Sequence, residues 1–169
     1  MDTTALNASG TGSYILCELA GATYAIRSDD IEQLEMVGSL TPVPNAPPFV
    51  DGVTTVRGRV IPAVSLRARF GFERIAHDLR TRLLVVRTAG RLVGLIVDTA
   101  REFATIDPEI IQPPPDAFGD SGGRYLRGTA HLGDRLVLVL DVAELLQIPD
   151  APTLSAPAFI TRDALPAAV

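Results

Sequence analysis

Two segments of this chain repeat one another, and this internal repeat restricts the possible folds more than any other feature. Residues Gly52–Phe70 align with Gly128–Leu146 without a gap, and apolar positions fall on apolar positions. A second pair of segments, Ile15–Asp29 and Leu84–Asp98, aligns in the same way, with glycine on glycine. Each half of the chain therefore has the order hairpin, linker, hairpin and short helix, which predicts two similar small units that share a core.

Strand-length apolar runs joined by short glycine-containing turns predict four hairpins. Five short strands can close into a small barrel that hides its edges, so we expect an all-β fold with minor short helices and two packed five-stranded barrels. The expected helices span Ser28–Glu35, Leu66–Phe70 and Val142–Leu146. The expected hairpin strands are Tyr14–Leu19 with Thr23–Ile26, Val53–Val56 with Val60–Val64, Leu83–Arg87 with Leu92–Val97, and Thr129–Leu132 with Arg135–Leu140.

The domain boundaries follow from composition. We expect a flexible leader at residues 1–12, one folded body at residues 13–148 and a Pro- and Ala-rich tail at residues 149–169. The leader lacks the charged and apolar regions of a secretory signal, and no apolar run approaches the length of a membrane span. The sequence therefore predicts a cytoplasmic protein without membrane insertion.

Charge and residue usage exclude several classes of site. A net charge of −5 and an aromatic content of 5% oppose nucleic-acid binding, so an oligonucleotide-binding barrel is a remote alternative. Cys17 is the only cysteine, which excludes an internal disulfide and a multi-cysteine metal site. His77 and His131 have no companion ligands at metal-binding spacing. We expect neither a metal nor a cofactor.

One short motif mimics an enzyme. The run Gly-Asp-Ser-Gly-Gly at residues 119–123 resembles the sequence around a serine-protease nucleophile. It lies in a Pro-rich loop, and no His and Asp framework accompanies it. A hydrolase is therefore a second remote alternative, and we expect no catalytic residue.

Several separated motifs resemble the CheW-type coupling proteins of bacterial chemotaxis. The run Thr41–Leu66 is similar to that family's Pro-rich loop and the strand pair "G-V-x-x-x-R-G-x-x-x-P-x-x-D-L". Val93–Asp98 is similar to its "V-G-x-x-V-D" strand, and Tyr125–Gly128 with Leu136–Leu146 is similar to its closing hairpin and helix. The resemblance covers about residues 13–147 and implies two SH3-like barrels, a scaffold function and no catalysis.

The resemblance also implies partners. These are the regulatory domain of a CheA-type histidine kinase and the cytoplasmic tip of a methyl-accepting chemoreceptor. Receptor helices are expected in the groove between the barrels and kinase contacts at the barrel ends, in receptor arrays at the inner face of the membrane. An adaptor of a twitching-motility or other non-flagellar chemosensory pathway is an alternative that the sequence does not separate from flagellar chemotaxis.

Eight residues are candidates for receptor contact by the same resemblance. Arg57, at a hairpin tip, would aim its guanidinium at receptor carbonyls or carboxylates. Ile31 and Leu34 lie three apart on an expected helix and would share a face. The full set is Ile31, Leu34, Gly52, Arg57, Gly58, Gly94, Ala100 and Phe103.

This chain departs from the family pattern near the first linker. Gln33 stands where the family often has Glu, so an ion pair between that position and Arg57 gives way to a weaker expected hydrogen bond. Ser65 replaces the frequent Asp at a helix start and still caps well. Three nearby arginines are expected to be solvated, namely Arg67, Arg69 and Arg74.

Overall fold

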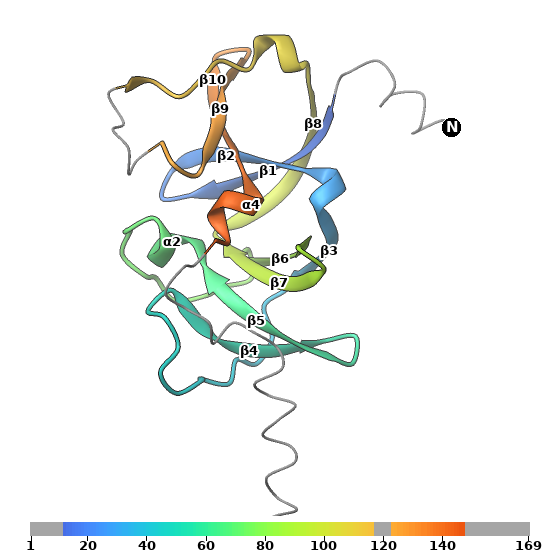
Figure 1. Cartoon of the computed structure of the whole chain (residues 1–169), viewed down its shortest axis with the longest axis vertical. Coiled ribbons are helices and arrows are strands. Elements are labelled where there is room, and N and C mark those ends of the chain that lie inside the picture. Colours follow the sequence, from blue (N-terminus) through green and yellow to red (C-terminus); the bar gives the residue numbers. More distant parts are fainter. Residues whose placement is uncertain (1–11, 117–122, 148–169) are drawn as a thin grey trace, which may run out of the picture.

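The computed structural model describes residues 12–116 and 123–147, and strands dominate it (Figure 1). The expected leader and tail lie almost wholly outside these residues. The strands are β1 (Gly12–Leu19), β2 (Ala22–Arg27), β3 (Ile31–Met36), β4 (Val50–Val56), β5 (Arg59–Ser65), β6 (Arg82–Thr88), β7 (Arg91–Val97), β8 (Thr99–Ile106), β9 (Leu126–Leu132) and β10 (Arg135–Leu140). The helical turns are η1 (Ser28–Asp30), α2 (Leu66–Arg69), η2 (Pro108–Ile110) and α4 (Val142–Leu145).

The strands form two five-stranded sheets that exchange hairpins between the halves of the sequence. Sheet A has the order β8-β1-β2-β10-β9, and sheet B has the order β3-β6-β7-β5-β4. Each sheet joins one hairpin from each half through a parallel pair, β2 with β10 and β5 with β7. Figure 1 shows sheet A above sheet B, with α2 and α4 between them. The two units are interlocked because neither sheet can form from one half alone.

The expected fold class is confirmed, but the predicted closure of the barrels and one predicted helix need correction. Hydrogen bonds do not close either sheet: across the described strands, no ladder joins β8 to β9 or β3 to β4. The helix expected at Ser28–Glu35 is wrong, because a single 3₁₀ turn is followed by strand β3. The residues of β3 are good helix formers, but pairing with β6 overrides that local preference.

The hydrophobic core has three parts because most strands are buried on both faces. In β1, Ile15 and Cys17 point into a central cluster between the sheets, whereas Tyr14 and Leu16 point into sheet A's own cluster. Sheet B has a matching cluster around Leu83. Burial of one Leu or Ile side chain contributes about 2 kcal/mol to folding. The central cluster contains several such side chains from both sheets, so their packing is the main interaction that holds the sheets together.

Two glycines allow the linkers to cross the sheets. The first linker pairs with β4 at Val53, and the second pairs with β9 at Thr129. A Cβ at Gly52 would lie 2.3 Å from the Thr41 carbonyl oxygen, and a Cβ at Gly128 would lie 2.3 Å from that of Gln112. These equivalent close approaches are the physical reason why the repeat contains glycine at both positions.

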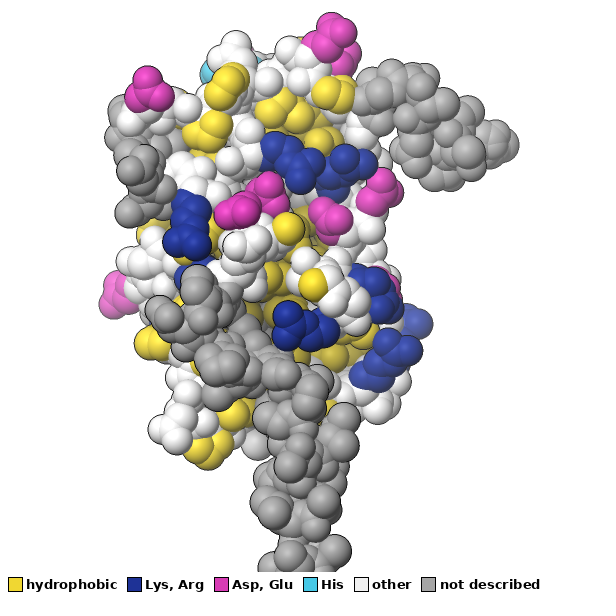
Figure 2. Space-filling model, in the orientation of Figure 1, with side chains coloured by type: hydrophobic (Ala, Val, Ile, Leu, Met, Phe, Trp, Pro, Cys, Tyr) yellow, Lys and Arg dark blue, Asp and Glu magenta, His cyan; other side chains and the backbone are white. Residues whose placement is uncertain are grey.

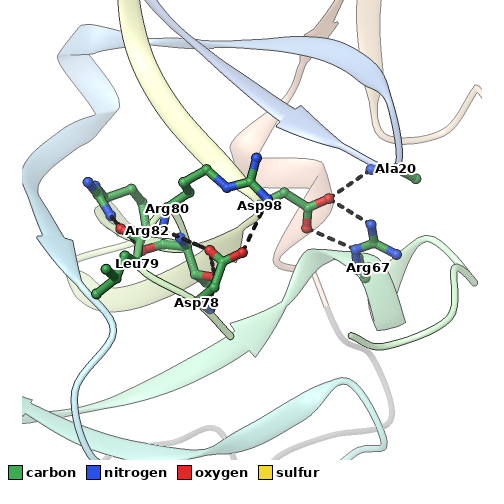
Figure 3. A network of polar contacts seen from close by, with 8 residues as sticks. Ala20, Arg67, Asp78, Leu79, Arg80, Arg82 and Asp98 are labelled. Carbon is green, nitrogen blue, oxygen red and sulfur yellow. Dashed lines mark hydrogen bonds and ion pairs between the residues drawn. The ribbon is translucent and has the colours of Figure 1, made fainter. Parts of the chain in front are cut away.

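A partly buried ion pair connects the two sheets (Figure 3). Asp98 follows β7 of sheet B and accepts a 3.0 Å hydrogen bond from the Ala20 N–H in the β1–β2 turn of sheet A. Arg67 of α2 donates to both carboxylate oxygens of Asp98, at 2.8 and 2.7 Å. Burial alone raises the pKa of Asp98, but the hydrogen bonds from Arg67 and Ala20 outweigh it, so the pKa lies below its ordinary value. The expectation that Arg67 is solvated is wrong.

Replacing Asp98→Asn should destabilise the protein by about 2 kcal/mol at pH 7, because Arg67 and the Ala20 N–H lose a charged acceptor. The native pKa of Asp98 is depressed, so its carboxylate stabilises the fold above the unfolded pKa of about 3.9, and this contribution is lost as the pH falls through the native value. Urea unfolding between pH 7 and pH 3 measures the difference between variant and wild type.

The control is Asp29→Asn, which removes an exposed ion pair with Arg27 and should change stability by less than about 0.5 kcal/mol. A stability difference for Asp98→Asn that does not shrink with falling pH would contradict the assigned role of the carboxylate.

Candidate functional site

Arg57 lies at the tip of the β4–β5 hairpin with its side chain in solvent. Arg57 and Gly58 are the central turn residues, and their φ angles of 49° and 81° have the signs of a type I′ turn. The Arg57 side chain is 75% exposed, and its Nε lies 3.9 Å from Oε2 of Glu35. The ion pair thus involves Glu35, and the hydrogen bond expected from Gln33 is not found. An exposed pair at this distance is weak, so the guanidinium is free to meet a partner.

A cavity of ≈ 210 Å³ opens beside Arg57 at the end of sheet B. Its floor is apolar and its rim is polar. Gln33 Oε1 is buried there and has no hydrogen-bond partner among the residues that the structure describes. The lining residues are Glu32, Gln33, Val56, Arg57, Arg59, Ile61, Val85 and Leu92.

Leu34 and Phe103 are exposed apolar side chains at equivalent positions in the two sheets. Leu34 pairs with Leu84, and Phe103 pairs with Ile15. Both partners belong to the central cluster, and paired residues point to the same face of a sheet. Leu34 (40% exposed) and Phe103 (68% exposed) therefore lie on the edge strands β3 and β8, on the face that bears the central cluster, and we call these two residues the seam rim.

The predicted shared face of Ile31 and Leu34 is real, but a β-bulge produces it. The register of β3 shifts between Ile31 and Gln33, so Ile31 and Leu34 both face the central cluster. The equivalent shift in sheet A places Ala100 and Phe103 on one face in the same way. In each pair the first residue packs inside and the second reaches the surface.

Four of the eight candidates are packing residues. Ala100 is 2% exposed, and Ile31 is half-buried against the central cluster. Gly94 is buried, and a Cβ there would lie 2.6 Å from Leu83 Cδ1. Gly52 is covered by the first linker. These four residues support the surface by packing below it. The other four candidates are exposed to solvent, namely Leu34, Arg57, Gly58 and Phe103.

The expectation that Arg69 is solvated is wrong, because its side chain is partly buried and makes structural contacts. Its guanidinium lies over the rings of Phe49 and Tyr125, at 4.5 and 4.7 Å from their centroids. It also donates hydrogen bonds to the carbonyls of Leu145 and Gln147, at the end of α4. Burial lowers the pKa of Arg69. The two aromatic residues occupy the same position of the internal repeat, which is the signal that could have revealed this contact.

Arg74 is exposed, as expected, and its half-exposed side chain also pairs with Asp51 at 2.8 Å. Arg74 Nη2 additionally donates to the Pro48 carbonyl oxygen. This arginine therefore attaches the loop after α2 to the first linker.

The described residues offer little reactive chemistry. No group of three or more His, Cys, Asp or Glu residues within residues 12–116 and 123–147 is arranged to hold a metal ion. Burial, with smaller effects from Asp98 and Glu18, raises the pKa of the Cys17 thiol to about 12, so this thiol stays protonated. Most of the Gly-Asp-Ser-Gly-Gly run lies outside the described residues. None of the described helices is long and apolar enough to cross a membrane.

Comparison with known proteins assigns the family. A family model described as the CheW-like domain matches residues 13–150. The chain belongs to the CheW-like family. The match spans both sheets and every residue of the candidate surface, so the family assignment applies to the whole described fold.

Named relatives agree with this assignment. The chain is 28% identical over 133 residues to the chemotaxis protein CheW of Klebsiella aerogenes, covering 79% of this chain and 80% of that protein. It is 35% identical to CheW of Helicobacter pylori, covering 73% and 74%, and 34% identical to protein FrzA of Myxococcus xanthus, covering 72% and 77%. The crystal structure of the scaffolding protein TtCheW from Thermoanaerobacter tengcongensis matches with a TM-score of 0.75 at 27% identity, covering 82% and 89%. The chain is thus a CheW-like scaffold of the chemotaxis type.

Gly94→Val should destabilise this CheW-like protein by about 2 kcal/mol, because the added methyl groups overlap the Leu83 side chain. Phe103→Ser should change stability by less than about 0.5 kcal/mol, because most of the ring is already in water. Thermal unfolding of both variants measures the contrast. Equal losses of stability would contradict the division into packing and surface residues.

Proposed function

We propose that this protein is a non-catalytic adaptor that couples chemoreceptors to a CheA-type histidine kinase. The observation that carries the proposal is the seam rim, where the large apolar side chains of Leu34 and Phe103 are exposed on the edge strands of the two sheets. We take these exposed apolar side chains as the receptor contact. Membership of the CheW-like family and similarity to named chemotaxis proteins support the same function.

The receptor is proposed to dock its helical cytoplasmic tip along the seam rim. An amphipathic helix can lay its apolar face over Leu34 and Phe103, and burial of a large apolar side chain contributes about 2 kcal/mol. Arg57 then supplies a guanidinium to receptor carbonyls or carboxylates, since its own ion pair with Glu35 is weak. Gly58 allows the turn to approach closely, because the position where a Cβ would lie is open space.

The kinase regulatory domain is proposed to bind at the barrel ends. Val60 follows the β4–β5 turn and Leu136 follows the β9–β10 turn, at equivalent positions of the repeat. They are 58% and 48% exposed. Figure 2 shows that apolar side chains reach the surface over both sheets, between charged groups. Two equivalent ends give the adaptor two contacts, which an assembly of alternating adaptors and kinases requires.

The mechanism we propose is assembly without chemistry. Binding of receptor and kinase to one rigid body links their conformational equilibria, so the receptor state changes kinase activity through a coupling free energy. The interlocked sheets suit this task because their shared core holds the two surfaces in a fixed relation. We place the adaptor in receptor arrays at the inner face of the membrane.

A non-flagellar chemosensory pathway, such as one for twitching motility, is the second candidate. The chain is about as similar to FrzA (34%) as to CheW of Helicobacter pylori (35%), so similarity does not favour either assignment.

Arg57→Ala should leave folding intact and reduce receptor-dependent kinase activation by about 10-fold, because one charge-assisted contact with the receptor is lost. A reconstituted assay with receptor-containing membranes and kinase measures this change. The matched control is Arg91→Ala, which removes an exposed arginine from the β6–β7 hairpin of the same sheet. Unchanged coupling for Arg57→Ala would remove Arg57 from the proposed site.

Val60→Ser and Leu136→Ser should each weaken binding of the kinase regulatory domain by about 10-fold, because each removes an apolar contact at one barrel end. Calorimetric titration of the kinase domain measures the affinity. Leu79→Ser is the control, since Leu79 is 79% exposed on a loop away from both hairpin tips. An equal effect of the control would show that the loss is not specific to the barrel ends.

A further inference from the structure

The open ends of the two sheets differ at one pair of equivalent positions. In sheet A, Glu102 of β8 receives two hydrogen bonds from Arg135 of β10, at 3.0 and 2.9 Å. Glu102 is paired with Leu16, which belongs to sheet A's own cluster. Arg135 lies two residues before Val137, another member of that cluster. The ion pair therefore covers the interior of sheet A where the strands leave it open.

In sheet B the same two positions hold Gln33 and Arg59. Gln33 is paired with Val85 of sheet B's cluster, just after the same bulge that precedes Glu102. Arg59 lies two residues before Ile61, as Arg135 lies before Val137. The replacement of a carboxylate by an amide removes one partner of the ion pair.

The consequence is a cavity that is lined by the Arg59 guanidinium and by the Gln33 amide, whose Oε1 has no partner among the described residues. Gln33 and Arg59 both line the ≈ 210 Å³ cavity, and no ion pair to Arg59 occurs within the described part of the chain. The other charged groups are already matched: Glu32 pairs with Arg87, and Glu35 lies 3.9 Å from Arg57. The hydrogen bond from Arg87 and the charges of Arg87 and Arg59 lower the pKa of Glu32, so Arg59 shares this carboxylate and has no ion pair of its own among the described residues.

The cavity is smaller than a typical small-molecule site of roughly 300–1,000 Å³ and suits a single side chain. A guanidinium binds a carboxylate through two parallel hydrogen bonds, as Arg135 does in sheet A. Rotation of the Gln33 amide about its last bond exchanges the unpartnered Oε1 for an N–H donor, which can then donate to the same carboxylate. The Arg59 guanidinium therefore favours a carboxylate as the bound group.

We propose that this cavity binds a Glu or Asp side chain of the receptor, which supplies in the complex the carboxylate that Glu102 supplies within sheet A. The inference rests on the proposed function, because it requires the receptor to cover the surface around Arg57. An ion pair completed by a partner forms only on binding, so Arg59 contributes to affinity and little to folding.

Three variants test the proposal in calorimetric titrations with a receptor cytoplasmic-tip fragment and in urea unfolding. Arg59→Gln should weaken receptor binding about 10-fold and leave the urea midpoint unchanged. Gln33→Glu should raise the urea midpoint and also weaken binding, because an internal carboxylate now occupies the cavity. The matched control, Arg135→Gln, should lower the urea midpoint and leave receptor binding unchanged.

Three outcomes would overturn the proposal. If Arg59→Gln lowers the urea midpoint as much as Arg135→Gln does, Arg59 already has a partner within the chain. If Arg57→Ala weakens binding while Arg59→Gln and Gln33→Glu bind normally, the carboxylate site is wrong and the adaptor function stands. If Arg57→Ala, Arg59→Gln and Gln33→Glu all bind normally, the receptor does not cover this surface, and the proposed receptor contact fails together with the cavity.

Discussion

The central apolar cluster between the two sheets is the interaction on which the rest of the structure depends. It takes alternate residues from β1, β2, β6 and β7, and the opposite faces of these strands form the separate clusters of sheets A and B. Because each sheet combines hairpins from both halves of the chain, the two halves cannot separate without breaking the β2–β10 and β5–β7 ladders. The Arg67–Asp98 pair and the position of Arg69 above two aromatic rings are additions to this shared core.

The same arrangement explains why the proposed binding surfaces lie where they do. A strand that packs on both faces has no free surface along its centre, so exposed apolar side chains occur where the packing ends. Leu34 and Phe103 lie on the edge strands β3 and β8, and Val60 and Leu136 lie just after the hairpin turns. Gly52 and Gly94 are covered residues that affect the surface indirectly. Because they lack a side chain, the first linker backbone packs against Gly52 and the Leu83 side chain packs against Gly94. A scaffold of this kind is rigid inside and offers several separate contacts outside.

The internal repeat makes the two halves of the molecule controls for one another. Equivalent glycines admit equivalent linkers at Gly52 and Gly128, and equivalent bulges set the direction of β3 and β8. A difference between two equivalent positions of the repeat therefore points to a difference in function. Glu102 and Arg135 complete an ion pair in sheet A, whereas Gln33 and Arg59 leave a cavity in sheet B. This difference gives the open ends of the two sheets different surface chemistry.

The sequence by itself determined the strands with alternating or continuous apolar residues, the glycine-containing turns and the internal repeat. These features are local, because they depend on the spacing of apolar side chains and on the backbone conformations that glycine allows. It did not determine β3, whose residues favour a helix until β6 supplies the ladder, nor the partners of Arg67 and Arg69, which come from distant segments. It named Arg57 by motif but assigned its ion-pair partner wrongly, since Gln33 and Glu35 lie on the same face of β3 and only the folded structure brings Glu35 to Arg57. Only the tertiary structure brings residues from separate strands to one surface, and so only it separates Gly94 and Ala100, which are core, from Leu34 and Phe103, which reach solvent.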